Sequence, residues 1–139
     1  MKKKLVLLLS VVLVMCGLLC ACGSTNNTEE DSNNNAEYVE VDGERYGIGE
    51  IPNEVQENEF KFEKYQSKEI TIVSEIRKVD YGAVISHVSI GWWDIEFDTD
   101  IYKDSLAELS AGDTVCITGK VTQLRGIEIV VQGSSIQLQ

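Results

Sequence analysis

Four acidic residues alternate along one short stretch of the chain: Asp94, Glu96, Asp98 and Asp100. Carboxylate oxygens are ligands that Ca²⁺ prefers, so the spacing raises the question of a cation site. On a β-strand, side chains two residues apart lie roughly 7 Å from each other. That is too far for neighbouring carboxylates to share one ion through bonds of about 2.4 Å, unless other loops contribute. The stretch also lacks the glycine and final glutamate of an EF-hand loop. It therefore predicts a solvated acidic face, with weak calcium binding as the alternative.

Nucleophilic catalysis would need a different pair of residues. His87 is the only histidine, and a catalytic partnership with Cys116 would require the two side chains to lie within about 3 Å of each other. Cys116 stands in an apolar run, where a lone cysteine usually behaves as a small hydrophobic residue. The sequence contains no nucleophile-elbow, zinc-protease or phosphate-loop motif. We therefore expect no catalytic residue and no cofactor.

A binding surface is indicated by two adjacent tryptophans. Side chains alternate along a strand, so if Trp93 points into the core, Trp92 must point out of it. An exposed tryptophan on a polar face is a residue type that often contacts partners. The predicted binding face comprises Trp92, Tyr81, His87, Lys120 and Arg125. The alternative is that an N-terminal helix or hairpin covers Trp92.

The N-terminus has the layout of an export signal. Lys2, Lys3 and Lys4 precede an uncharged run over residues 5–19, which is shorter than the roughly 20 residues that a membrane-spanning helix needs. The sequence Leu19-Cys20-Ala21-Cys22 then resembles the bacterial lipobox. This resemblance implies that residues 1–21 are a cleaved signal peptide and that Cys22 carries lipid. The alternatives are an uncleaved anchor helix and a secreted protein that is cut elsewhere.

Lipidation would change both the cysteine count and the charge. Cys16 and Cys20 would leave with the signal peptide and Cys22 would be acylated, so Cys116 would remain as the one thiol and no disulfide framework is expected. Loss of three lysines leaves nine basic residues against 23 acidic ones, a net charge near −14. Such a chain is repelled by an anionic membrane surface, so the lipid must supply the attachment.

The elements that position these residues follow a polar segment. Residues 22–50 are predicted to be a flexible tether, in which Asp42-Gly43 could close a small hairpin. Residues 51–66 predict a helix. Strands are predicted over residues 68–79, 83–90, 92–98, 113–124 and 127–138, with bends at Gly119 and Gly133. Residues 100–109 predict a short helix, with Ser105 and Glu108 at capping-box spacing.

Three strands, a short helix and two strands is the order of an OB-fold. Residues 109–121 resemble the L-x-x-G-D-x-V-x-(I/V)-x-G-x-V pattern of bacterial OB-fold domains. Residues 65–72 are similar to the lead into the first strand in the tRNA-anticodon-like group of these domains, whose function is unknown and which often follow lipobox signals in Gram-positive envelopes. The resemblance implies a mainly β, five-stranded Greek-key barrel over residues 51–139, with an N-terminal helix and a short helix between the third and fourth strands. Ser74 stands where many such domains have glycine, so we expect the first strand to bend less sharply.

Nucleic acid is a common ligand of OB-folds, but the charge disfavours it here. Binding of a phosphate backbone needs a positive groove, whereas Lys120 and Arg125 are outnumbered by the acidic residues of the third strand. We therefore expect a non-enzymatic binding module on the extracytoplasmic face of the cell membrane, anchored through Cys22. Its partner would be an envelope protein, a peptide or a glycan. The alternative is a calcium-dependent or enzymatic role for the acidic face.

Overall fold

The computed structural model describes residues 37–139. The predicted signal peptide, the predicted lipidation site Cys22 and the predicted tether up to residue 36 lie outside this range. Within it, none of the helices has the length and apolar character needed to cross a membrane.

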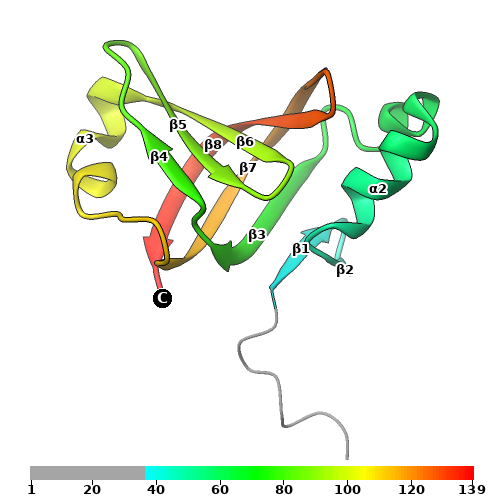
Figure 1. The fold of residues 1–139 in the computed structure, drawn as a ribbon, viewed down its shortest axis with the longest axis horizontal. Helices are drawn as coiled ribbons and strands as arrows, with labels where there is room; N and C mark the ends of the chain where they lie inside the picture. The colour runs from blue at the N-terminus through cyan, green and yellow to red at the C-terminus, as the bar shows by residue number, and fades with distance from the viewer. Residues whose placement is uncertain (1–36) are drawn as a thin grey trace, which may run out of the picture. The chain divides into compact units, whose positions relative to one another are not determined.

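One antiparallel-rich sheet dominates the described part of the chain (Figure 1). Its strand order is β2-β1-β3-β7-β8-β6-β5-β4, and only β6 and β8 pair in parallel among the ladders of the sheet. The strands are β1 (Tyr38–Val41), β2 (Glu44–Gly47), β3 (Glu69–Glu75), β4 (Lys78–Asp80), β5 (Ile85–Ile90), β6 (Trp93–Asp98), β7 (Thr114–Arg125) and β8 (Glu128–Leu138). The predicted mainly β class is confirmed. The sheet has eight strands rather than five and is open, with β2 and β4 at its two ends.

The first predicted long strand is divided into β3 and β4. The N–H of Ile76 donates to the carbonyl of Asp113 (2.8 Å), next to β7, whereas the N–H of Arg77 donates to the carbonyl of Ser89 (2.9 Å) on β5. Two consecutive residues thus bond to different strands. Ser74, where we expected a gentler bend, still pairs with Val115 of β7, and the change of partner comes between Ile76 and Arg77.

The Asp42-Gly43 hairpin forms and joins the sheet. Asp42 and Gly43 have φ angles of 51° and 84°, as a two-residue turn with two left-handed positions requires. An isolated two-stranded hairpin is marginally stable in water. Here β1 also pairs with β3, and Val39 and Val41 are buried, so the hairpin is held by the rest of the sheet.

The predicted helix over residues 51–66 is wrong as a single element. The structure has α2 (Glu50–Glu57) and a 3-10 helix, η1 (Glu59–Lys64), separated by Asn58 in an extended conformation. The Asn58 side chain accepts a hydrogen bond from the N–H of Phe60 (3.1 Å). Asparagine favours such caps over helix interiors, because its side chain competes for backbone N–H groups.

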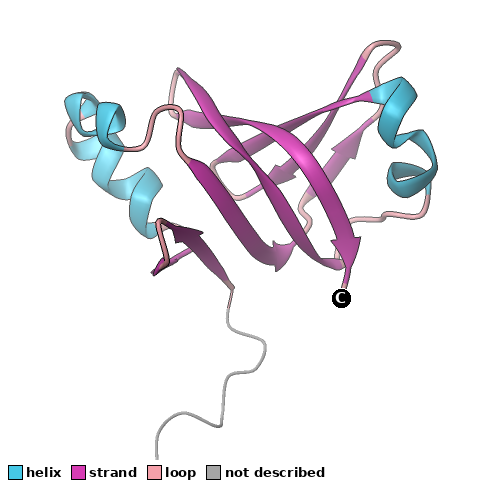
Figure 2. Cartoon of the chain, turned by 180° about the vertical axis from the view of Figure 1, so that it is seen from behind, coloured by secondary structure: helices cyan, strands magenta, loops and turns pink. Residues whose placement is uncertain are grey.

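The predicted second helix is present as α3 (Thr99–Ala107), but its predicted cap is wrong. Asp98 caps the helix, since its carboxylate accepts hydrogen bonds from the N–H groups of Asp100 (3.0 Å) and Ile101 (3.2 Å). Ser105 lies near the C-terminal end instead. Figure 2 shows α2 and α3 at opposite ends of the sheet.

The core follows the predicted alternation of the strands. Trp93, Ile95 and Phe97 of β6 are buried, and the Trp93 indole donates to the carbonyl of Ile48 (2.8 Å). The predicted irregularity at Gly119 is confirmed: Thr118 pairs with Ser135 but Gly119 pairs with Gly133, so Ser134 has no partner in the ladder. At Gly133 a Cβ atom would collide with the ring of Phe97, so only glycine fits there without a shift.

Candidate binding site

A shallow pocket of about 480 Å³ lies on the outward face of β4, β5 and β6, at the β7–β8 hairpin. We call it the β4–β6 pocket. Its lining comprises Arg77, Lys78, Asp80, His87, Ser89, Gly91, Asp94, Arg125 and Glu128. Three of these side chains are basic and three are acidic, so with a neutral histidine their charges cancel. The pocket is polar but carries no net charge.

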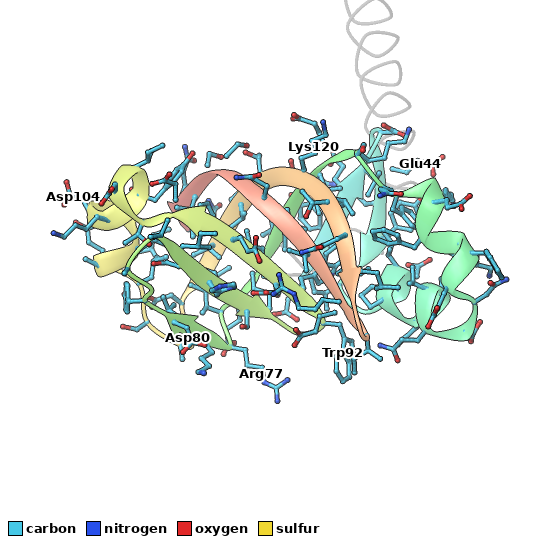
Figure 3. All side chains as sticks on the ribbon, turned by 90° about the horizontal axis from the view of Figure 1, so that it is seen from above. Glu44, Arg77, Asp80, Trp92, Asp104 and Lys120 are labelled. Atoms are coloured by element: carbon cyan, nitrogen blue, oxygen red, sulfur yellow. The ribbon has the colours of Figure 1, made fainter. Side chains whose placement is uncertain are left out.

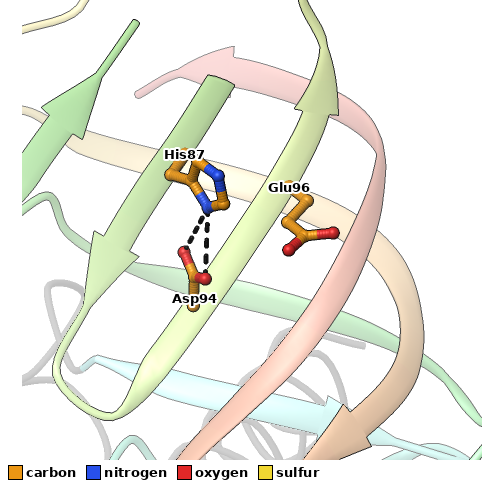
Figure 4. Close-up of side chains that lie close together, drawn as sticks. All are labelled: His87, Asp94 and Glu96. Atoms are coloured by element: carbon orange, nitrogen blue, oxygen red, sulfur yellow. Dashed lines mark hydrogen bonds and ion pairs between the residues drawn. The ribbon is translucent and has the colours of Figure 1, made fainter. Parts of the chain in front are cut away.

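Asp94 is the acidic group at its centre. It is on the outward face of β6, yet only 7% of it is exposed. Its carboxylate oxygens lie 3.0 and 3.1 Å from Nδ1 of His87, contacts that are drawn as dashed lines in Figure 4. One of these oxygens also accepts a hydrogen bond from Nη1 of Arg125 at 3.0 Å. His87 and Arg125 therefore cover a carboxylate that alternation alone would expose to solvent.

Arg125 connects two strands that are remote in the sequence. It ends β7, directly before Gly126, whose φ of 63° begins the turn into β8. Besides its contact with Asp94, it donates from Nη2 to Glu96 at 2.7 Å. The hydrogen bond to Glu96 is the main cause that raises the pKa of Arg125, so the guanidinium stays charged. The tip of the hairpin is thus tied to β6 by two charge-assisted hydrogen bonds.

Trp92 lies in the turn between β5 and β6, next to Gly91 of the pocket. It is 39% exposed, whereas Trp93 is 1% exposed. The α2 helix and the β1–β2 hairpin therefore leave Trp92 accessible. Its carbonyl accepts a hydrogen bond from the N–H of Ile129 (2.9 Å), which fixes this turn against β8.

The structure does not bring the other two residues of the predicted face into this pocket. Tyr81 is exposed, and its hydroxyl donates to the carbonyl of Leu106 (2.5 Å), beside α3. Lys120 is exposed on β7, and Figure 3 shows it on the opposite side of that view from Trp92 and Arg77. Of the five predicted residues, His87 and Arg125 line the pocket, and Trp92 directly follows its lining residue Gly91 in the chain.

The four alternating acids also separate. Asp98 caps α3, and Asp100 is an exposed residue in the first turn of that helix. Among residues 37–139, the cluster with metal-ligand geometry is instead His87, Asp94 and Glu96, whose ligand atoms lie within 4.8 Å of one another (Figure 4). The sequence analysis placed His87 in the binding face but did not group it with these two carboxylates. The signal for this grouping was the tight Gly91-Trp92 turn, because pairing Ile90 with Trp93 across that turn places His87 opposite Glu96.

Comparison with known proteins gives no relative from which a function can be transferred. No protein-family model matches the chain, and no match was found among curated proteins.

Proposed function

We propose that this protein is a lipid-anchored, extracytoplasmic binding module without enzymatic activity, and that its ligand is a neutral glycan bound in the β4–β6 pocket. The observation that carries the proposal is the combination of a charge-balanced polar pocket with an exposed tryptophan that directly follows the lining residue Gly91. Each part has a separate chemical consequence.

The balanced charge favours an uncharged polar ligand. An anionic or cationic ligand would meet three side chains of its own sign in the pocket. A sugar has hydroxyl groups that donate to carboxylates and accept from guanidinium groups, so it can use both kinds of side chain. Arg125 is already held by Asp94 and Glu96, and this preorganisation lowers the entropy cost of binding.

Trp92 supplies the apolar part of the surface. A rigid indole contributes contact area with little loss of conformational freedom. The neighbouring carbonyl bond to Ile129 holds the turn that carries Trp92. We propose that a sugar ring packs on this indole while its hydroxyl groups reach the pocket.

The finer fold proposal is an OB-like barrel of the tRNA-anticodon-like type. Two features support it. The strands β3 and β4 are separated by only two residues in the chain, yet they lie at the two ends of the strand order β3-β7-β8-β6-β5-β4. In addition, β6 pairs in parallel with β8. If β3 and β4 act as one bent strand, the pocket lies on the face through which OB-folds bind oligosaccharides and oligonucleotides. The neutral pocket and the acidic chain favour the sugar over the nucleic acid.

The membrane location rests on the lipobox around Cys22. Its test is cell fractionation after Cys22→Ala, which is expected to release the protein from the membrane. Retention of the variant in the membrane fraction would refute the lipid anchor.

Glycan binding is tested by titrating the protein with neutral oligosaccharides, including a tetramer of N-acetylglucosamine, while tryptophan fluorescence is recorded. Trp93 is buried, so a ligand-dependent change reports on Trp92. We expect Trp92→Ala to abolish the change, Arg125→Ala to weaken binding and Lys120→Ala, on the other side of the molecule, to leave it unaltered. An unchanged signal with every neutral sugar, or a stronger response to heparin or single-stranded DNA, would exclude the proposal.

A second candidate is cation binding, which the proximity of His87, Asp94 and Glu96 favours. A cation there would have to displace Arg125 from both carboxylates, and this competition counts against tight binding. Thermal melts with and without millimolar calcium or zinc test it, because a ligand of the native state raises the melting temperature. An identical melting temperature in all three conditions would eliminate this candidate.

A further inference from the structure

A second surface lies between the α2–η1 segment and the hairpin of β7 and β8, whose tip it shares with the β4–β6 pocket. It consists of two adjoining hollows of about 660 and 250 Å³, which share Glu59 and Leu124 in their linings. We call this surface the Phe60 groove. Its apolar residues are Phe60, Phe62, Leu124, Val55 and Ile127.

Two apolar residues of the groove are open to solvent. Phe60 is 84% exposed and Ile127 is 50% exposed, whereas Phe62 and Val55 are buried. A single exposed apolar side chain is common on protein surfaces, but a rimmed apolar patch marks an interaction site. Phe60 is the most exposed large hydrophobic residue in the described part of the chain.

Local hydrogen bonds hold Phe60 in this position. The N–H of Phe60 donates to the Asn58 side chain, and the N–H groups of Tyr65 (2.9 Å) and Gln66 (3.0 Å) donate to the carbonyl of Phe62. Phe62 packs into the core and anchors the short helix. The outward aromatic ring is therefore presented by an ordered segment, which reduces the entropy cost of docking.

The charged rim of the groove has one sign. Glu57, Glu59 and Glu63 line it, and neither hollow has a lysine or arginine in its lining. The two lysines of η1 are engaged elsewhere: Lys61 pairs with Glu54 at 3.5 Å, and Lys64 donates to the hydroxyl of Tyr65 at 3.2 Å. The negative charge of the rim therefore favours a positively charged partner.

From this arrangement we infer that the Phe60 groove docks a basic segment of a partner protein, with an aliphatic or aromatic residue of the segment packed on Phe60 and its lysines or arginines paired with the three glutamates. A second copy of this chain fits less well, since the chain carries a net charge of −11. An anionic lipid surface would be repelled by the same glutamates. The Phe60 groove and the β4–β6 pocket share no lining residue, although both adjoin the tip of the β7–β8 hairpin.

The test uses a fluorescein-labelled decapeptide that alternates lysine with leucine, titrated with the protein and read by fluorescence anisotropy. We expect saturable binding, weakened about tenfold by Phe60→Ala and similarly by the double change Glu59→Gln and Glu63→Gln. The matched control is Ile101→Ala, since Ile101 is 73% exposed on α3 and also has acidic neighbours, Asp100 and Asp104. This control is expected to bind as the parent does.

Two further measurements distinguish a basic peptide from a lipid surface as the ligand of the Phe60 groove. Salt at about 1 M, where the Debye length is about 3 Å, is expected to weaken the peptide complex. Vesicles of zwitterionic or anionic lipid are expected not to bind. Absence of peptide binding, equal effects of Phe60→Ala and Ile101→Ala, or stronger binding to either vesicle would overturn the inference. Because Phe60 is exposed, an unchanged melting temperature of Phe60→Ala verifies that the variant is folded.

Discussion

Asp94 is the residue on which the geometry of the β4–β6 pocket depends. It is nearly buried, and its partners His87 and Arg125 come from different strands. We expect Arg125→Ala to lower the free energy of unfolding by more than the control below does, because a nearly buried carboxylate loses a charged donor. Urea denaturation measures this. The control is Lys78→Ala, which breaks an exposed ion pair with Asp80 and is expected to cost less than about 0.5 kcal/mol. Equal costs for the two variants would contradict the assigned role of Asp94.

Tyr65 provides a second prediction at the scale of a residue. Its buried hydroxyl donates to Glu54 at 2.5 Å, and burial, followed by this hydrogen bond, raises the pKa of Tyr65 above its ordinary value. A raised pKa means that the folded protein holds the phenolic proton more tightly. The resulting stability is complete below pH 10, the ordinary pKa, and is lost as the pH rises above it.

The measurement is the melting temperature between pH 8 and about 11. We expect the parent to lose stability steeply above pH 10 and Tyr65→Phe to lose it less steeply. At neutral pH the same substitution is expected to cost about 1 kcal/mol, for the lost hydrogen bond. Parallel pH profiles for the two proteins would show that Tyr65 is not responsible.

The N-terminal cap of α3 is Asp98 in the structure, whereas the sequence indicated Ser105. Asp98→Ala removes the side chain that accepts from two backbone N–H groups, so we expect a loss of about 1 kcal/mol. Ser105→Ala is expected to change the free energy of unfolding by less than about 0.5 kcal/mol. Chemical denaturation of both variants is the measurement. The reverse order of effects would restore the capping box predicted from Ser105 and Glu108.

The close contact between Gly133 of β8 and the ring of Phe97 on β6 leads to a further prediction. Gly133→Ala would drive a methyl group into the ring of Phe97, and we expect a loss of about 1–3 kcal/mol. Adding Phe97→Leu should recover part of this loss, since the smaller side chain leaves room. Gln132→Ala, at an exposed position of β8 next to Gly133, is the control and is expected to change stability little. If the double variant were as unstable as the sum of the two single variants, the ring would not be the cause.

For the whole molecule, the sequence predicts what is periodic and misses what depends on distant contacts. The alternation around Trp93, Ile95 and Phe97 correctly identified the buried face of β6. The break at Asn58 was missed, because helical spacing continues across it while the cap depends on backbone geometry. The register of β5 and β6 was readable from their tight turn. The contacts of Arg125 were not, since no local pattern indicates where the β7–β8 hairpin packs.

A prediction for the whole molecule concerns the start of the folded unit. A chain that begins at Ile51 lacks β1, and with it the buried side chains of Val39 and Val41. It also exposes the edge of β3, an unpaired edge that favours aggregation. We expect a chain of residues 37–139 to melt cooperatively and a chain of residues 51–139 to melt at a lower temperature or aggregate. Equal melting temperatures would mean that the hairpin is dispensable.

The attachment of β1 has a mechanical consequence. Tension transmitted from the N-terminal side enters the described domain at Glu37, whose carboxylate accepts hydrogen bonds from the Ser74 hydroxyl (2.8 Å) and the Glu75 N–H (3.0 Å). The load then passes to the four-residue ladder between β1 and β3. This ladder has fewer residue pairs than the ladder between β7 and β8, so we expect it to separate first. The β1–β2 hairpin would then peel away under force, while the strands that form the β4–β6 pocket remain folded.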